Sequence, residues 1–266
     1  KAHKHNELLK PVLLPMVEPP VDWCKNGKGG YLDKAFLVGS LVKTNDRSYQ
    51  DELQNLNMPK VYQTINRLQR TGYVVDKPQL EIMRHFWSNG LSVGGLPSPD
   101  NLMLPSKPLD IETNSDARRA WRKSAARVHF ENERQQSKRL QVAKVFYLAD
   151  KYADSSLFFP HKLDFRARCY PRPYFLQPQG PEYARTLLRF SQALPIKDDN
   201  AASWLALYVA NSWGEDKKSF NDRIRWVEEN EPLIKRVALD PLRNVSGKML
   251  TLLGSFFLHP VSGRHS

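Results

Sequence analysis

The chain has 266 residues, of which 41% are hydrophobic, and its 40 lysines and arginines exceed its 28 aspartates and glutamates, giving a formal net charge of +12. This size can bury a substantial core in one or two domains, and the positive charge favours polyanionic partners. The apolar runs are too short for a membrane-spanning helix, and the two cysteines, Cys24 and Cys169, lack the spacing of a disulfide framework or zinc site, so we expect ordinary buried thiols in a reducing cytoplasm.

Residues 1–57 are rich in proline and glycine, which interrupt regular secondary structure. We therefore expect loops and short elements laid over a larger body in this part of the chain. A helical pattern follows, in which Val61, Ile65 and Leu68 recur on one face. Pro59 lies near the start of that helix, where proline is tolerated.

A second short helix is expected at Leu80–Trp87, followed by a loop of about 20 residues at Asn89–Asp110 that is flexible or ordered by a partner. A long helix then reaches about Asp154, with Ser115 or Asp116 as its N-cap. The apolar residues that recur along it at helical intervals are Trp121, Ala125, Val128, Leu140, Ala143, Phe146 and Tyr147.

The other faces of this long helix carry a strong local excess of positive charge. The cations are Arg118, Arg119, Arg122, Lys123, Arg127, Arg134, Lys138 and Arg139. Such a pattern fits either a charged face that meets only water or a surface that binds a polyanion.

The segment Phe158–Ile196 contains two arginines, an acidic residue and several aromatics in a turn-rich stretch. If the chain is extended here, Arg166 and Arg168 project from one face, and their planar forks of donors suit phosphate oxygens. Tyr170 has the same parity and offers a plate for a base or sugar, while Asp164 could orient the arginines from behind. The alternative is a strand with a structural Asp–Arg ion pair.

Pro178–Gly180 is predicted to be a turn, in which Gly180 takes a positive φ or lets a nucleic-acid backbone approach closely, so Gln179 and Gly180 are candidate contacts. Three further helices are expected, at Tyr183–Phe190, at Ala202–Val209 and at Phe220–Val237, the last beginning at Ser219 or Asn221.

Leu163–Phe190 reads LDFRARCYPRPYFLQPQGPEYARTLLRF and resembles the DxRGRxY…PQG…LL.F segment that opens the palm of single-subunit, phage-type RNA polymerases, a family of bacteriophages and mitochondria. In that family the two arginines and the tyrosine lie along the template and the RNA–DNA hybrid, which implies this role for Arg166, Arg168 and Tyr170. Ala167 stands where the family has glycine, a difference that matters if the position needs a positive φ.

The resemblance continues in order over roughly residues 13–243. It implies that Arg134, Lys138 and Arg139 belong to the basic turn of the thumb that contacts the hybrid. The other matching segments are Leu13–Trp23, Gly29–Leu32, Met58–Val75, Ala120–Leu140 and Ser219–Pro232.

The implied fold is mainly α with a small antiparallel β part, a partial right-hand polymerase. Its parts are the end of an N-terminal domain and the lead-in to the core (residues 1–70), a helical thumb (71–155), the amino-terminal part of the palm (156–243) and an unassigned tail (244–266). Because the resemblance fades after Leu242, and Lys248–Phe257 read one base earlier can spell a family-like sequence, we expect an out-of-frame tail.

The resemblance also implies Mg²⁺ chemistry, because the family holds two magnesium ions between aspartates of a DG and an HDD motif. Neither motif occurs in this sequence, and the fingers helix that grips the nucleotide is absent. We therefore expect no catalytic residue and no bound Mg²⁺ in this chain, and inactivity of the chain alone. The chain would be either one half of a split enzyme, whose second chain carries the fingers and catalytic palm, or a frameshifted fragment. The cytoplasm of an infected bacterial host is favoured over a mitochondrion.

Three functions are compatible with these patterns. The first is a portion of a DNA-directed RNA polymerase that holds the DNA template and the RNA–DNA hybrid. The second is a non-catalytic, basic nucleic-acid-binding protein. The third is a structural or interaction protein whose basic helices bind an acidic partner.

Overall fold

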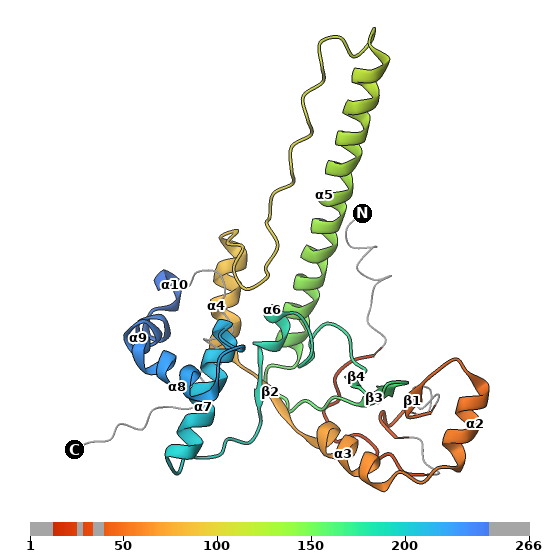
Figure 1. Ribbon diagram of the computed structural model, residues 1–266, viewed down its shortest axis with the longest axis vertical. Coiled ribbons are helices and arrows are strands. Elements are labelled where there is room, and N and C mark those ends of the chain that lie inside the picture. The colour runs from red at the N-terminus through yellow and green to blue at the C-terminus, as the bar shows by residue number, and fades with distance from the viewer. Residues whose placement is uncertain (1–12, 26–28, 34–39, 245–266) are drawn as a thin grey trace.

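The computed structural model describes residues 13–25, 29–33 and 40–244, so the expected out-of-frame tail lies outside the described residues. Figure 1 shows a lower body from which one long helix projects. The described elements are β1 (Val42–Lys43), α2 (Arg47–Asn55), α3 (Pro59–Arg70), β2 (Tyr73–Val75), α4 (Lys77–Ser88), α5 (Ser115–Lys151), β3 (His161–Asp164), β4 (Cys169–Pro171), α6 (Glu182–Arg185), β5 (Leu188–Phe190), α7 (Asp199–Trp213), α8 (Phe220–Glu229), α9 (Glu231–Leu239) and α10 (Pro241–Asn244).

The strands form two small sheets. One has the order β1-β3-β4, and the other pairs β2 with β5. The β3–β4 and β2–β5 pairs are antiparallel, whereas β1 and β3 are parallel and are joined by a long connection through four helices, as parallel pairing requires. The prediction of a mainly α fold with a small β part is confirmed, with this parallel pair as an addition.

Three groups of buried apolar residues hold the body together. The largest joins β2, α4, the carboxyl-terminal part of α5 and α6, and includes Met83, Val145 and Leu187. A second packs Ile65 of α3 against Leu163 of β3, next to the sheet β1-β3-β4. The third lies between α7 and α9. The Phe158–Ile196 segment contributes to the first two groups, with Phe159 and Leu187 in one and Leu163 in the other.

Helix α3 begins at Pro59, and α4 contains the predicted Leu80–Trp87 helix. The expected apolar face of α3 is partly wrong, because Leu68 is 41% exposed while Gln69 is fully buried. The side-chain amide of Gln69 donates to the carbonyl of Val21 at 2.7 Å, which gives a buried polar group a partner at this contact.

Helix α5 has 37 residues and is capped by Asn114, not by Ser115 or Asp116. The Asn114 Oδ1 accepts the backbone N–H groups of Asp116 and Ala117, each at 3.1 Å. Two residues of the predicted apolar stripe, Ala143 and Tyr147, are exposed, because the predicted Phe146 shares the buried face with Val142, Val145 and Ala149. No described helix is both long and apolar enough to cross a membrane.

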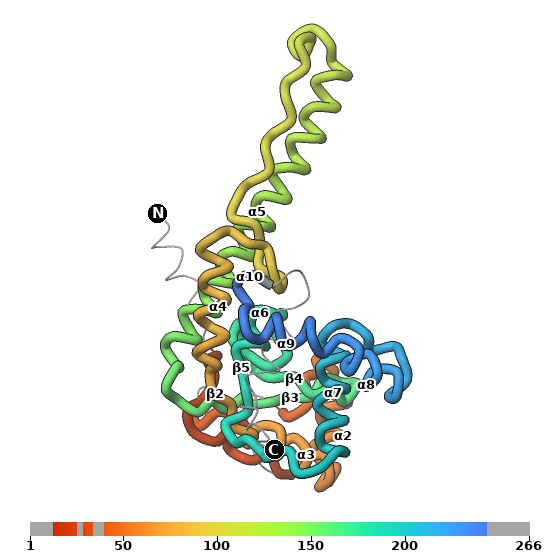
Figure 2. Tube along the Cα trace, turned by 90° about the vertical axis from the view of Figure 1, so that its left-hand side faces the viewer, coloured from red at the N-terminus to blue at the C-terminus, as the bar shows by residue number. Residues whose placement is uncertain are grey.

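Residues 98–113, here called the strap, run back along α5 in both Figure 1 and Figure 2. Asn132 binds the backbone of Leu102 in both directions, accepting its N–H at 2.7 Å and donating to its carbonyl at 3.0 Å. The indole N–H of Trp121 donates to the carbonyl of Pro105 at 2.9 Å. This part of the predicted loop therefore has defined partners on the helix.

The predicted helix at Tyr183–Phe190 is wrong after Arg185, where α6 ends and β5 follows. Strand β5 pairs with β2, more than a hundred residues earlier, and the ring of Phe190 lies 5.1 Å from the ring of Tyr73. The pairing with a distant strand overrides the local helical pattern.

Helix α7 contains the predicted Ala202–Val209 helix, but Phe220–Val237 is two helices, α8 and α9, separated at Asn230. Ser219 caps α8 as predicted, its side chain accepting the N–H of Asp222. Pro232 explains the break, because its ring lacks the N–H needed to continue the first helix and suits the first turn of the next.

The prediction of two buried thiols is half right. Cys24 is exposed, whereas Cys169 is half-buried in β4, where burial raises the pKa of its thiol above the ordinary value.

Candidate nucleic-acid interface

The two motif arginines lie at a tight turn between β3 and β4, not along an extended strand. Asp164 ends β3, Arg166 lies in the turn, and Arg168 directly precedes β4. The backbone N–H of Ala167 donates to the carbonyl of Asp164 at 3.0 Å, and this bond closes the turn. The alternation rule that placed both guanidinium groups on one strand face therefore does not apply to Arg166.

Asp164 orients the Arg168 side chain as predicted, and it holds Arg166 through the backbone N–H. Its Oδ1 accepts the N–H groups of Arg166 at 2.9 Å and Arg168 at 3.0 Å, and its Oδ2 accepts the Arg168 Nε–H at 2.7 Å. Desolvation by itself would raise the pKa of Asp164, but the hydrogen bonds from Arg168 and Arg166 outweigh it and hold this pKa below its ordinary value. The carboxylate thus stays ionised at neutral pH.

Ala167 adopts the left-handed conformation, with φ of 59°. A residue with a Cβ costs about 1–2 kcal/mol more than glycine would in this region. Alanine in place of the family's glycine therefore strains the backbone at this position. The bonds that Asp164 makes on both sides of Ala167 hold the backbone in this conformation.

Both guanidinium groups and the rings of Phe165 and Tyr170 reach the surface. The Arg166 guanidinium lies 5.2 Å from the ring centroid of Phe165, and that of Arg168 lies 5.8 Å from the ring centroid of Tyr170. The Arg168 side chain is 58% exposed although it pairs with Asp164. Donor groups beside aromatic plates are a suitable surface for phosphates and bases.

Gln179 and Gly180 lie beside the same hairpin, but Gly180 does not have the predicted positive φ. A Cβ at Gly180 would lie 3.0 Å from the carbonyl oxygen of Gln177, so packing within the chain disfavours a side chain there. Phe175 has the left-handed conformation instead, with φ of 66°. The side-chain amide of Gln179 donates to the carbonyl of Cys169 at 3.1 Å, which ties the turn to β4.

The three predicted cations of α5 have different surroundings. Arg134 pairs with Glu131 at 3.1 Å and is 57% exposed, and Lys138 is half-buried. Arg139 is engaged by the strap: its guanidinium donates to the carbonyl of Ser98 at 3.0 Å and to the Asn101 side chain at 2.7 Å. The structure therefore does not gather Arg139 with the hairpin arginines on one surface.

Comparison with known proteins decides the family. A sequence model of the DNA-dependent RNA polymerase family matches residues 196–250. The chain is 34% identical over 239 residues to the DNA-directed RNA polymerase of Enterobacteria phage K11, an alignment that covers 89% of this chain and 26% of that protein. It is 31% identical over 239 residues to the T7 RNA polymerase of Escherichia phage T7, covering 89% and 27%. The chain belongs to the single-subunit, phage-type RNA polymerase family.

A mitochondrial DNA-directed RNA polymerase of Neurospora crassa is also similar, with 30% identity over 233 residues that cover 86% of this chain and 16% of that protein. The chain spans about a quarter of the length of the phage relatives. It therefore corresponds to one segment of the phage-type polymerases.

Three cations that lie beside the β3–β4 hairpin of this polymerase segment were not identified from the sequence. Lys43 on β1 is paired with Asp164, and Lys162 on β3 is paired with Tyr170. Arg172 follows β4, and its backbone N–H donates to the carbonyl of Pro160 at 2.7 Å. Lys162, Asp164, Tyr170 and Arg172 occupy alternate positions, and this alternation could have indicated that their side chains share one face of β3 and β4. Lys43 could not be found in this way, because it is far away in sequence.

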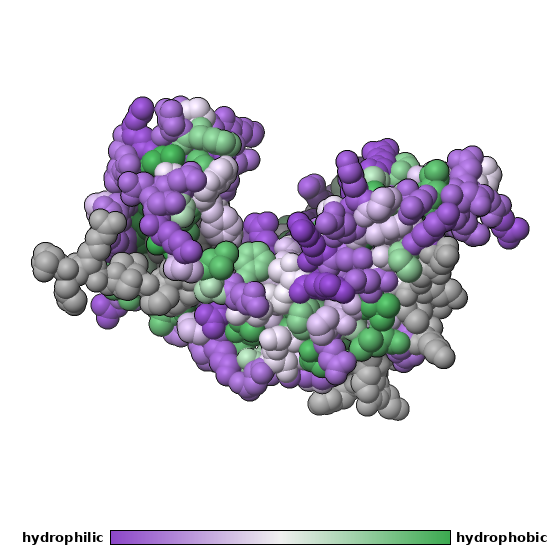
Figure 3. Space-filling model, turned by 90° about the horizontal axis from the view of Figure 1, so that it is seen from below, coloured by the Kyte–Doolittle hydropathy of each residue, from purple (hydrophilic) through white to green (hydrophobic). Residues whose placement is uncertain are grey.

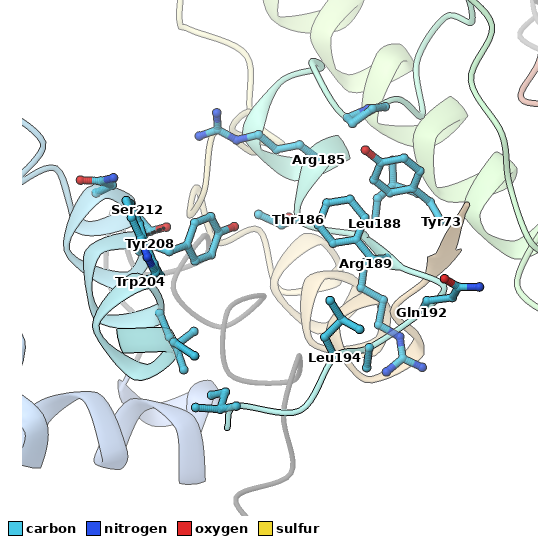
Figure 4. Close-up of a pocket in the computed structure, with 17 residues that line it drawn as sticks. Tyr73, Arg185, Thr186, Leu188, Arg189, Gln192, Leu194, Trp204, Tyr208 and Ser212 are labelled. Carbon is cyan, nitrogen blue, oxygen red and sulfur yellow. Dashed lines mark hydrogen bonds between the residues drawn. The ribbon is translucent and has the colours of Figure 1, made fainter. Parts of the chain in front are cut away.

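A second feature of this polymerase segment is a cavity of about 770 Å³ between β5 and α7. Figure 4 shows Trp204 and Tyr208 of α7 on one side, with Leu188, Arg189 and Leu194 on the other. Several of its apolar side chains are exposed, including Leu194 (79%) and Trp204 (59%). Figure 3 shows that apolar patches interrupt a largely hydrophilic surface on the lower side of the molecule.

Among the described residues of this polymerase segment, no group of three or more His, Cys, Asp or Glu side chains is arranged to hold a metal ion. Asp164 in particular is committed to the turn and to Arg168. The described carboxylates therefore do not fit a two-magnesium site.

Proposed function

We propose that the chain holds the DNA template and the RNA–DNA hybrid during template-directed RNA synthesis, as a portion of a DNA-directed RNA polymerase. The observation that carries this proposal is the β3–β4 hairpin of a chain of the phage-type polymerase family. Asp164 fixes the turn that bears Arg166 and Arg168, and Arg168 lies beside Tyr170. Guanidinium forks bind phosphates and the tyrosine ring supports a sugar or base. Gln179, which is tied to β4, would border the same surface.

In this proposal, residues 1–70 lead into the polymerase core, 71–155 form the thumb, and 156–243 form the amino-terminal part of the palm. Helix α5 would then approach the hybrid with the face opposite the strap. The strap is bound by Arg118, Trp121, Asn132 and Arg139, which recur at helical spacing on one side.

The opposite face of α5 is exposed and basic, and it includes one large aromatic, Phe130, which is 68% exposed. Arg134 belongs to this face, so Arg134 is favoured over Arg139 as a contact with the hybrid. Lys138 lies between this face and the face that binds the strap. Contacts of this kind would hold the duplex by its phosphates without reading its sequence. The residues of this face are Arg119, Lys123, Arg127, Phe130 and Arg134.

We further propose that the chemistry requires polypeptide beyond these residues. The sequence has no DG or HDD motif, so the Mg²⁺ ions that such polymerases use would be bound by a segment carrying the fingers and catalytic palm, here assigned to a second chain. The cavity between β5 and α7 supports this assignment, because exposed Trp204, Tyr208 and Leu194 suit an apolar partner and Arg185 and Arg189 suit its acidic groups.

The similarity to polymerases of phages K11 and T7 supports the cytoplasm of an infected bacterium as the place of action. A mitochondrial location is the alternative, because a mitochondrial polymerase is also similar.

The decisive experiment mixes the 266-residue chain with candidate chains that carry DG and HDD motifs and measures RNA synthesis on a primed template with Mg²⁺ present. We expect no synthesis by either chain alone and synthesis by the correct mixture. Binding of an RNA–DNA hybrid without activity in any mixture would indicate a non-catalytic nucleic-acid-binding protein. Failure to bind nucleic acid even at low salt would indicate an interaction protein with an acidic partner.

A further inference from the structure

The strand register places several charged side chains on one face of the sheet β1-β3-β4. Lys43 is opposite Asp164, and Lys162 is opposite Tyr170. Residues that face each other across strands point to the same side of the sheet, and so do alternate residues of one strand. The bond from the Arg172 N–H to the Pro160 carbonyl continues the β3–β4 register by one pair. Arg172 therefore lies on the same face as Lys162.

Two of these cations rest on buried aromatic rings. The Lys162 Nζ lies 6.0 Å from the ring centroid of Trp23, and the Arg172 guanidinium lies 5.2 Å from that of Tyr31. Trp23 is 3% exposed, and Asn66 binds its backbone in both directions, accepting its N–H at 2.8 Å and donating to its carbonyl at 2.9 Å. The rings are rigid supports, so less side-chain freedom is lost when the cations bind a ligand.

Positive charge is concentrated here. The described residues of β1, β3, β4, the turn between them and position 172 carry five cations and one carboxylate, Asp164. Burial, and then the charges of Arg172 and Lys43, lower the pKa of Lys162 to about 8. Holding like charges close together is unfavourable for folding, and an anion that neutralises them would remove this repulsion.

We propose that Lys43, Lys162 and Arg172 form a phosphate-binding cluster that grips the backbone of a nucleic-acid strand next to Arg168 and Tyr170. The inference rests on the proposed function, because it extends the same surface across the sheet. Tyr170 connects the two parts: it is paired with Lys162 on one side and lies against Arg168 on the other. The cluster binds phosphodiester groups by charge and contributes no base recognition.

The test compares Lys162→Gln with Lys217→Gln, which removes the same charge from an exposed site between α7 and α8. Affinity of the full chain for a short labelled RNA–DNA hybrid is measured over a range of salt concentrations. We expect Lys162→Gln to reduce the slope of log affinity against log salt by about one, and Lys217→Gln to leave it unchanged. Lys162→Arg keeps the charge and should retain the slope, and a thermal melt of each variant checks that it is folded.

Equal slopes for the two glutamine variants would overturn the cluster. If wild-type chain binds the hybrid and Arg168→Ala weakens it while Lys162→Gln does not, the proposed function stands and this inference alone fails. If the wild-type chain does not bind the hybrid at low salt, both fail.

Discussion

Asp164 and Arg168 are joined by both their backbones and their side chains across the β3–β4 turn. The Asp164 N–H donates to the Arg168 carbonyl, the Arg168 N–H donates to Asp164 Oδ1, each at 3.0 Å, and the guanidinium reaches Oδ2 at 2.6 and 2.7 Å. The orientation of Arg168 is thus set before any ligand arrives. Such preorganisation reduces the entropy lost when a phosphate is bound.

The first prediction concerns acid sensitivity. The pKa of Asp164 is lower in the fold than in the unfolded chain, so its contribution to stability is complete above the ordinary value near 4 and is lost as the pH falls through the folded pKa. Asp164→Asn should therefore flatten the loss of stability between pH 5 and 2, as measured by urea unfolding at several pH values. An unchanged pH profile would contradict this role.

The second prediction concerns Ala167. Replacing it by glycine should raise the free energy of unfolding by about 0.5–1 kcal/mol, because glycine adopts the left-handed conformation without strain but loses more entropy on folding. Ala126→Gly, on the exposed side of α5, is the matched control and should lower stability by about 1 kcal/mol. Chemical denaturation measures both, and a loss of stability in Ala167→Gly would show that the turn does not need this conformation.

The third prediction separates Arg139 from Arg134. Arg139→Ala removes the bonds to Ser98 and Asn101, so the strap should become more sensitive to limited proteolysis. Arg134→Ala should leave the strap protected and instead weaken binding of an RNA–DNA hybrid. If Arg139→Ala weakened hybrid binding as much as Arg134→Ala and left the strap protected, the assignment of the two faces would be wrong.

The fourth prediction concerns the cavity between β5 and α7. Trp204→Ser should weaken association with a complementing polymerase chain, because it removes an exposed aromatic side chain from the proposed contact. Leu109→Ser changes another exposed apolar side chain, on the strap, and should have no effect. Analytical ultracentrifugation of the mixtures measures the association. Equal weakening by both variants would show that the cavity is not the contact with the complementing chain.

The fifth prediction concerns Lys162 and stability. Its pKa is lowered to about 8 in the fold, so the unfolded chain binds more protons above that pH and stability should rise from pH 8 towards pH 10. Lys162→Met should abolish this rise and be more stable than the wild type at pH 7. Thermal melts across this range give the answer, and a wild-type stability that falls with pH in step with the variant would refute the assignment.

The predictions made from the sequence succeeded where a pattern was long or a local bond was strong. The 37-residue α5, the start of α3 at Pro59 and the cap of α8 at Ser219 follow from periodicity and capping chemistry. The role of Asp164 behind Arg168 was also predictable, because a short acidic side chain readily accepts N–H groups two to four residues later.

The failures have identifiable physical causes. The alternating DFRAR pattern is typical of a strand, but the bonds to Asp164 fold it into a turn with Ala167 left-handed. Strand β5 could not be foreseen because its partner β2 is distant in sequence. Lys43 was missed for the same reason, because the parallel pairing of β1 with β3 brings it to the candidate site. Long-range strand pairing thus accounts for β5 and Lys43, whereas the turn at Ala167 results from local bonds.

The projecting helix has a mechanical consequence. With 37 residues α5 is about 55 Å long, and only its carboxyl-terminal part is anchored in the main core. A tilt of about 5° at that anchor moves the free tip by about 5 Å, close to one helical turn. The bonds between the strap and α5 oppose bending of the helix. A small repacking at its carboxyl-terminal anchor would therefore move its amino-terminal end as a lever arm transmits rotation.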